Sequence, residues 1–270
     1  MKFRVSAAQR AALMMQLAPH LRPDENAGAG AQYPVVSLYY DNDERDCYWE
    51  KARGLPSRRK LRVRVYGSRD GVVPATAFVE IKHKCEGRGV KRRVQLPLEQ
   101  ALRVCEGQWP DAAQFSETDA RVIREAHEMV LRRHFKPVLV MRYDRTAYAA
   151  ADPQSDLRVT FDSGARVRFD HLTPESDDRR FDAAAEIAEE GVAVMEVKIT
   201  GCIPYWLSRT IAEAGCHMQS HSKYSSALEH HDPVLRAMLS PQWRARLAGC
   251  VTESPAFSPM AAPAFAPVAG

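Results

Sequence analysis

The sequence predicts an α+β fold in which an antiparallel sheet curls into a β-barrel tunnel with a charged lumen, flanked by α-helices. Three segments carry their charges on alternate residues: Lys60–Val65, Val79–Lys84 and Met195–Ile199. Because side chains on a strand repeat every two residues, each segment places its charges on one face and most of its apolar residues on the other. Glu80 and Glu196 each precede a lysine by two residues. Several such strands indicate a sheet around a charged lumen, which suits a polyanion and a metal ion.

Composition indicates a chain that can bury a core. Of the 270 residues 45% are apolar, and no apolar stretch approaches the roughly 18 to 20 residues needed to span a bilayer. The six cysteines form no Cys-x-x-Cys pair, so the sequence indicates neither a zinc site nor a disulfide framework, and a reducing cytoplasm fits best. We expect one domain over residues 1–250, followed by a disordered Pro- and Ala-rich tail over residues 251–270.

The distribution of charge along the chain indicates the ligand class better than the net charge of +4 does. From Lys51 to Arg93 there are fourteen Lys and Arg against three Asp and Glu, a local charge of +11 that leaves −7 for the rest of the chain. So uneven a field over contiguous sequence favours a phosphate-rich ligand. The alternative is a basic face that is simply solvated.

In the first half of the chain, each expected element follows from its own signal. Ser6 and Gln9 form a capping box that opens a helix, which Pro19 stops. Gly and Pro signals join two cationic strands, and a Gly87–Gly89 turn leads into a third, as in an antiparallel meander. The expected strands are Lys2–Val5, Val35–Tyr40, Lys60–Tyr66, Phe78–Lys84 and Val90–Leu96, with a loop over 22–32 and a turn or helix cap over 41–43.

In the second half, Ser116 and Asp119 can cap a helix that ends near His134, and Pro204 opens a helix that Gly215 closes. An acidic stretch over 170–190 is expected to be a loop or an exposed helix. The expected strands are Val138–Tyr148, Leu157–Asp162, Arg166–Phe169 and Val192–Ile199.

The residue types on the charged faces suit phosphoryl transfer, which needs cations to hold phosphates in line and a metal to neutralise developing charge. Mg²⁺ and Mn²⁺ take oxygen ligands, so Glu196, and with less support Glu80, are candidate metal ligands. The alternative is that each glutamate pairs with the lysine two residues on or with a cation across the strand. No Walker or Rossmann glycine signature and no nucleophile elbow accompany them.

Two competing ligand classes are less well supported. His217 and His221 lie four apart, so a helical zinc pair is conceivable, but no glutamate pattern accompanies it, and His221 fits better beside the phosphate site or at the surface. Binders of single-stranded nucleic acid interleave cations with exposed aromatic residues. Here the cations alternate mainly with Val, Leu and Ile, so we expect no nucleic-acid partner.

An ordered set of short blocks resembles the VTC domain, the polyphosphate polymerase domain of the vacuolar transporter chaperone complex, in the CYTH-like triphosphate tunnel metalloenzyme superfamily. The resemblance covers about residues 2 to 229, and the set is specific although each block is weak. The blocks are Ser37–Asp41, Arg59–Arg64, Glu80–Lys82, Val90–Arg93, Tyr143–Tyr148, Leu157–Asp162, Glu196–Lys198 and Ser222–Tyr224.

The resemblance implies a tunnel enzyme that transfers the terminal phosphate of ATP to a growing polyphosphate chain with Mn²⁺ or Mg²⁺. It implies that Glu196 ligates the metal and that Arg62, Arg64 and Lys82 act with it in catalysis. Together with the other cations of the charged strands, the implied ligands of triphosphate or polyphosphate are Lys2, Lys60, Arg62, Arg64, Lys82, Lys91, Arg93, Arg145, Arg158, Lys198 and Lys223.

The sequence departs from the family pattern at its start. Relatives usually carry a glutamate two residues before the lysine that Lys2 matches, and the numbered chain begins at Met1. It also carries neither the SPX regulatory domain nor the membrane helices of the eukaryotic complex, so coupling to transport would need a separate partner at the inner face of the membrane.

Three functional hypotheses remain open. The leading one is a polyphosphate polymerase that acts on ATP and on polyphosphate or pyrophosphate. A second is a triphosphatase or polyphosphatase that uses the same tunnel with water as acceptor. The third is a non-catalytic polyphosphate-binding module of a membrane or envelope system.

Overall fold

The computed structural model describes residues 1–25, 32–67, 75–110, 114–174, 181, 187 and 191–239. The chain divides into two units, Met1–Asp232 and Pro233–Gly270. Of the second unit, the described part is the short helix α7, Pro233–Met238, together with the residue that follows it. The predicted tail over 251–270, the turn residues Gly71 and Pro74, and most of the acidic stretch over 170–190 lie outside the described residues.

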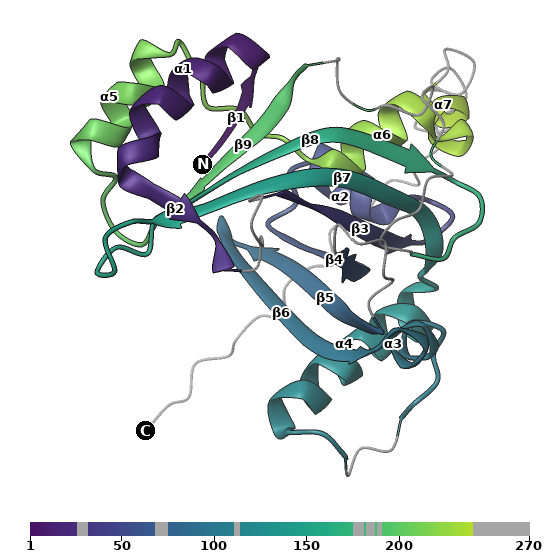
Figure 1. The fold of residues 1–270 in the computed structure, drawn as a ribbon. Coiled ribbons are helices and arrows are strands. Elements are labelled where there is room, and N and C mark those ends of the chain that lie inside the picture. Colours follow the sequence, from purple (N-terminus) through teal and green to yellow (C-terminus); the bar gives the residue numbers. More distant parts are fainter. Residues whose placement is uncertain are drawn as a thin grey trace, which may run out of the picture. The chain divides into compact units, whose positions relative to one another are not determined.

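The first unit is built on one antiparallel sheet of nine strands (Figure 1). The strand order is β1-β9-β8-β7-β3-β4-β5-β6, and β2 pairs with β7 off this path. The strands are β1 Lys2–Val5, β2 Leu21–Pro23, β3 Gln32–Asp41, β4 Ser57–Tyr66, β5 Thr76–Cys85, β6 Arg88–Pro97, β7 Lys136–Ala150, β8 Arg158–Arg168 and β9 Ala193–Lys198. The predicted α+β class with a large antiparallel sheet is therefore confirmed.

The sheet is curled, with β7, β8 and β9 arching over β4, β5 and β6 (Figure 1). Its end strands are β1 and β6, and no ladder joins these two in the described part of the chain. The barrel expected from the sequence is therefore an open, curled sheet and not a cylinder closed by hydrogen bonds. On the outer edge of β1, Met218 forms a bridge with Phe3, and the Gln219 amide donates to the Lys2 carbonyl.

The apolar face of the sheet points outward and is covered by helices. On β4, Leu61, Val63 and Val65 are fully buried, and α3 and α4 pack on the neighbouring strands β5 and β6. At the other end of the sheet, α1 and α5 cover an apolar cluster drawn from β1, β8 and β9. The helices are α1 Ala7–Leu17, the 3₁₀ helix η1 Ala18–His20, α2 Asp46–Ala52, α3 Leu98–Val104, α4 Glu117–Arg133, α5 Tyr205–Glu213 and α6 Lys223–His231.

Local capping signals located the long helices correctly. The Ser6 hydroxyl accepts from the Gln9 amide while the Gln9 side chain accepts from the Ser6 amide, so the capping box of α1 is confirmed. The Ser116 hydroxyl caps α4, which ends at His134 in the left-handed conformation. Pro204 stands at the N-cap of α5, one position before the first turn expected for it.

Other predictions were wrong in detail. Helices α2, α3 and α6 were not expected. Of the expected loop over 22–32, residues 22–23 belong to β2, Gln32 begins β3, and 26–31 lie outside the described residues. The two strands expected over 157–169 are one strand, β8. Its continuity depends on a bulge in which Gly164, at φ +59°, and Ala165 together face the single residue Tyr143 of β7. Glycine adopts this left-handed conformation without a Cβ clash.

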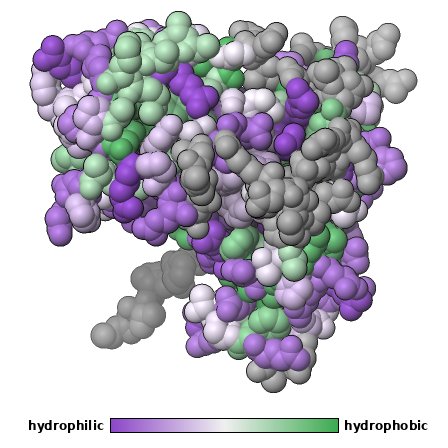
Figure 2. All heavy atoms as spheres, in the orientation of Figure 1, coloured by the Kyte–Doolittle hydropathy of each residue, from purple (hydrophilic) through white to green (hydrophobic). Residues whose placement is uncertain are grey.

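None of the helices that the structure describes is long and apolar enough to cross a membrane. The face drawn in Figure 2 is mostly hydrophilic, and its apolar residues lie in small separate patches, one of them over α1. Isolated exposed apolar residues of this kind are normal for a protein surface.

Candidate triphosphate-binding site

A cavity of about 1720 Å³ occupies the concave side of the sheet. It is lined by β1 and β3 to β9, and by a segment over 218–224 that leads into α6. All eleven cations predicted to bind phosphate line it, as does Glu196. Strand alternation explains why: on β4 the even-numbered residues from Arg58 to Tyr66 face the cavity while the odd-numbered apolar residues are buried behind them.

One cluster of charges is centred on Glu80 of β5. The side chain of Glu80 is only 1% exposed, and it does not line the cavity. Its Oε2 lies 2.6 Å from Nη2 of Arg62 and 3.8 Å from Nη1 of Arg64, and its Oε1 lies 3.2 Å from Nζ of Lys91. Burial by itself raises the pKa of Glu80, but these three cations hold it well below its usual range.

Both oxygens of Glu80 are thus occupied by cations. This is the cross-strand pairing that the sequence left open as the alternative to a metal site, although the partners are Arg62 and Lys91 and not Lys82. As placed here, Glu80 orients cations, and its side chain is buried and does not line the cavity. The arrangement gives no support to the expectation that Glu80 ligates a metal.

A second cluster is centred on Asp162 of β8, which the sequence reasoning did not select. Arg145 binds its carboxylate in bidentate fashion, with Nε 2.7 Å from Oδ1 and Nη2 2.9 Å from Oδ2. Lys223 of α6 places Nζ 2.6 Å from Oδ2. Burial raises the pKa of Asp162, but Lys223 and Arg145 together bring it well below its usual range. The alternation of Arg158, Thr160 and Asp162 could have placed this carboxylate on the charged face.

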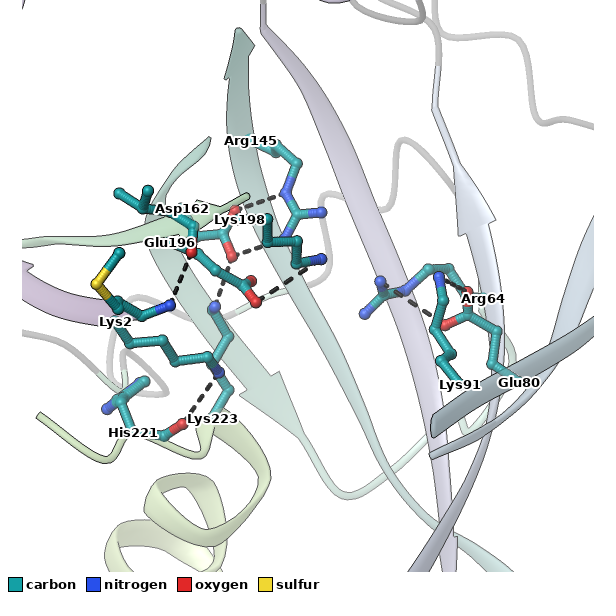
Figure 3. Close-up of polar contacts among 12 residues, drawn as sticks. Lys2, Arg64, Glu80, Lys91, Arg145, Asp162, Glu196, Lys198, His221 and Lys223 are labelled. Atoms are coloured by element: carbon teal, nitrogen blue, oxygen red, sulfur yellow. Dashed lines mark hydrogen bonds and ion pairs between the residues drawn. The ribbon is translucent and has the colours of Figure 1, made fainter. Parts of the chain in front are cut away.

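Glu196 of β9 is the more accessible carboxylate of the lumen. Its side chain is 24% exposed, and Oε1 lies 3.7 Å from Nζ of Lys198. Lys2 of β1 is its register partner, and Nζ of Lys2 donates to the His221 carbonyl at 3.1 Å. Figure 3 shows Lys2, Asp162, Glu196 and Lys198 gathered apart from the Glu80 cluster. Burial raises the pKa of Glu196, but Lys198 and Lys2 together lower it.

Two tyrosines lie among these cations. Nη1 of Arg62 donates to Tyr39 Oη at 3.1 Å; burial raises the pKa of Tyr39, but Arg62 and Arg64 lower it to about 8. The ring of Tyr143 lies under Lys223, whose Nζ is 4.6 Å from the ring centroid, with Arg145 and Arg64 also over the ring. Both tyrosines belong to blocks of the family resemblance, but neither was selected as a site residue.

Helix α6 carries Lys223 into the lumen because buried polar contacts hold its first and last turns. Tyr224 Oη donates to Asp41 Oδ2 at 2.5 Å, and the other oxygen of Asp41 accepts the backbone N–H of Cys47. At the C-terminal end, Nε of Arg45 lies 2.5 Å from Oδ2 of Asp232. The residues that hold α6 in place therefore come from the end of β3 and the start of α2, far away in the sequence.

The charge of the lining points to a polyanion. Fourteen lysines and arginines line the cavity against two carboxylates, Asp162 and Glu196, and Asp162 is already occupied by cations. Such an excess of fixed positive charge inside a concave surface concentrates phosphate-rich ligands. The sequence also matches a family model, that of the VTC domain, over residues 1–231. The chain belongs to the VTC domain family.

The similarity to individual solved structures is lower. A putative adenylate cyclase from Bacillus halodurans aligns with a TM-score of 0.47 and 13% identity over 86% of this chain and 95% of that one. A protein from Pyrococcus horikoshii aligns with a TM-score of 0.41 and 14% identity, over 84% of this chain and 97% of that one. A putative adenylate cyclase from Vibrio parahaemolyticus aligns with a TM-score of 0.37 and 9% identity, over 85% of this chain and 97% of that one. No curated protein matches the sequence.

The donor set of this VTC domain fits a divalent metal held mainly by its substrate. Among the described residues no three His, Cys, Asp or Glu side chains gather as a ready metal cage. Mg²⁺ and similar ions are often bound by one or two carboxylates together with substrate phosphates. Glu196 is the lumen carboxylate with accessible oxygens, and it stands beside the cations that would hold those phosphates.

The disfavoured helical pair of His217 and His221 does not form, because residues 217–222 precede α6 in an irregular segment. His221 lines the cavity of the VTC domain and is half-buried. Burial lowers its pKa to about 4, and Lys223 and Lys2 contribute. A neutral His221 at neutral pH adds no charge to the phosphate site, and its carbonyl positions Lys2.

Proposed function

We propose that this VTC domain is a metal-dependent polyphosphate polymerase that transfers the terminal phosphate of ATP to a growing polyphosphate chain. The observation that carries the proposal is the cavity lining, which combines fourteen cations with a single accessible carboxylate, Glu196. A site built this way would offer cations that hold phosphates and a ligand for one metal ion. It suits transfer between two phosphate chains.

In the proposed step, a terminal oxygen of the acceptor chain forms a bond to the γ-phosphorus of ATP. The bond between that phosphorus and the β–γ bridging oxygen breaks, and its electron pair leaves with ADP. Arg62 and Arg64 would hold the phosphoryl group, and Lys82 would stand beside them across the strand pair. Divalent metal at Glu196, Mn²⁺ or Mg²⁺, would supply neutralisation of charge on the phosphate oxygens.

Positioning supports these roles. Glu80 fixes Arg62, Asp162 fixes Arg145 and Lys223, and both carboxylates are almost fully buried. Cations held in this way need little reorganisation when phosphates arrive, which is the main protein contribution to phosphoryl transfer.

The test is an incubation of purified protein with ATP and Mn²⁺ or Mg²⁺, with ADP, free phosphate and polyphosphate resolved. We expect polymer in step with ADP, and we expect Arg62→Ala and Glu196→Ala each to abolish chain growth. Glu99→Gln on α3, an exposed site outside the cavity, is the matched control. Free phosphate without polymer would indicate water as the acceptor, and binding without turnover under either metal would indicate a binding module.

A further inference from the structure

Cations outside the predicted phosphate site extend the lining at one end of the cavity. Lys51 of α2, Arg58 of β4 and Lys84 of β5 line it there, and we call them the mouth cations. Arg58 and Lys84 are register partners across the β4–β5 ladder. In the described part of the chain, neither Lys51 nor Lys84 has a carboxylate partner, and Arg58 donates only to the carbonyl of Leu55. Within this part of the chain, no ion pair neutralises their charges.

The mouth cations continue a row of positive charge that begins deep in the lumen. Along β4, Arg64, Arg62, Lys60 and Arg58 occupy alternate positions on the cavity side. Arg64 and Arg58 are six positions apart, which on a strand corresponds to about 20 Å. A triphosphate, with three phosphorus atoms joined by two bridging oxygens, is too short to contact the whole row. A longer anion is needed to neutralise both ends together.

Lys60 connects the two ends of the row. Its Nζ is buried, lines the cavity side and makes no hydrogen bond among the described residues. The Nζ atom lies over the Tyr224 ring, 4.6 Å from its centroid. A buried ammonium group without a hydrogen-bonding partner is costly unless a ligand supplies one. Burial also lowers the pKa of Lys60, and an anion beside it would restore the charged form.

We propose that Lys60 and the mouth cations form an extended phosphate subsite that binds the distal part of an inorganic polyphosphate chain. The phosphates at the reacting end lie deeper, at Arg62 and Arg64, and those further along the chain pass Lys60 and reach Arg58, Lys84 and Lys51. The subsite rests on the proposed function for the identity of the chain. It adds that this cavity distinguishes long chains from triphosphate by contacts outside the reacting site.

The experiment compares two ligands, tripolyphosphate and long-chain polyphosphate, by calorimetric titration without ATP or metal. The test variant is Arg58→Gln/Lys84→Gln, and the control is Arg103→Gln/Arg121→Gln, which removes the same charge from exposed sites on α3 and α4 outside the cavity. Thermal melting of both variants verifies that they fold. The full chain is used throughout.

We expect the test variant to bind long-chain polyphosphate about tenfold more weakly than the parent, which corresponds to about 1.4 kcal/mol. Its affinity for tripolyphosphate should stay within about twofold of the parent, a difference of about 0.4 kcal/mol. The salt dependence of long-chain binding should also become less steep, by about 0.7 for each phosphate of a flexible chain that the variant no longer neutralises. The control should change both affinities little and equally.

Equal weakening for both ligands, or a loss of affinity no larger than in the control, would overturn the proposal. The readout is independent of ATP turnover. A protein that fails to polymerise but still shows the length-dependent weakening would refute the polymerase and keep the subsite. A protein that polymerises without the length-dependent weakening would keep the polymerase and refute the subsite.

Discussion

Arg62 and Glu80 face each other across β4 and β5, and two nitrogens of Arg62, Nε at 2.8 Å and Nη2 at 2.6 Å, approach the same oxygen of Glu80. The carboxylate is almost fully buried, whereas Arg62 also lines the cavity. Glu80 therefore lies behind the cation and fixes its orientation. Less side-chain freedom is left to lose when an anion binds, which favours affinity.

Glu80→Gln should destabilise the protein, because Arg62, Arg64 and Lys91 would keep their positive charges with no buried counter-ion. Removing one partner of a buried pair typically costs about 3 to 5 kcal/mol. Tripolyphosphate should restore more of the melting temperature in this variant than in the parent, since the ligand replaces the missing charge. Thermal melting with and without the ligand checks this, and equal ligand-induced shifts in both proteins would count against it.

Glu196→Gln should separate metal use from phosphate binding. Loss of the carboxylate removes the proposed metal ligand, so metal-dependent turnover should vanish. It also removes a negative charge beside Lys2 and Lys198, so tripolyphosphate should bind a few-fold more tightly in metal-free buffer. Turnover assays and metal-free titrations measure the two effects. The exposed Glu213→Gln on α5 serves as the control, and unchanged turnover at Glu196→Gln would refute the assignment.

Polyanion binding should weaken as pH rises through about 8. Above that value Tyr39 gains a negative charge beside Arg62 and Arg64, since these two groups lower its pKa to about 8 against the effect of burial. Lys2 loses its positive charge over the same range, because burial lowers its pKa to about 8 while Glu196 opposes the shift. Both changes make the lumen less positive.

The matched variants are Tyr39→Phe, which cannot ionise, and Lys2→Arg, which stays charged. Each should flatten part of the decline in affinity for one polyphosphate preparation between pH 7 and pH 9, and the double variant should flatten most of it. Titration of the ligand itself cancels in the comparison. A double variant with the parent profile would show that neither group governs the dependence.

Lys60→Met should raise the melting temperature of the ligand-free protein. The ammonium is buried without a hydrogen-bonding partner, so an apolar side chain of similar length avoids the cost of burying a charge. The same change should reduce the stabilisation that long-chain polyphosphate provides. Melting curves with and without polyphosphate test both signs, and a lower ligand-free melting temperature would contradict the account of Lys60.

Tyr224→Phe should destabilise the protein by ~1–3 kcal/mol, because Asp41 Oδ2 would lose the phenolic donor and remain buried. The free energy of unfolding from urea titration measures the destabilisation. Tyr205→Phe is the control, since Tyr205 is highly exposed. The Tyr224 variant should also bind tripolyphosphate more weakly, since Lys223 precedes Tyr224 at the start of α6. Equal stability in the two variants would show that the Asp41 contact is unimportant.

Short-range patterns predicted much of the fold. The charge alternation on β4, β5 and β9 placed cations and Glu196 on the concave face, and all eleven predicted cations line the cavity, whereas Glu80 of the same pattern is buried and does not line it. Capping signals located α1 and α4. Helices α2 and α3 were missed because each has only seven residues and no side-chain cap. Helix α6 was missed although Ser222 caps it; it has only nine residues, and its first two belong to the Ser222–Tyr224 block.

What the sequence by itself determined is which side chains face the lumen, since side-chain direction on a strand repeats every two residues whatever the strand packs against. The tertiary structure decided which charges meet. Lys223 reaches Asp162, 61 positions earlier, and Lys91 reaches Glu80 from the next strand. These pairings depend on sheet register, curl and the docking of α6 through Tyr224 and Asp41. Such long-range contacts leave no local pattern, because each partner only requires an opposite charge at the right place in space.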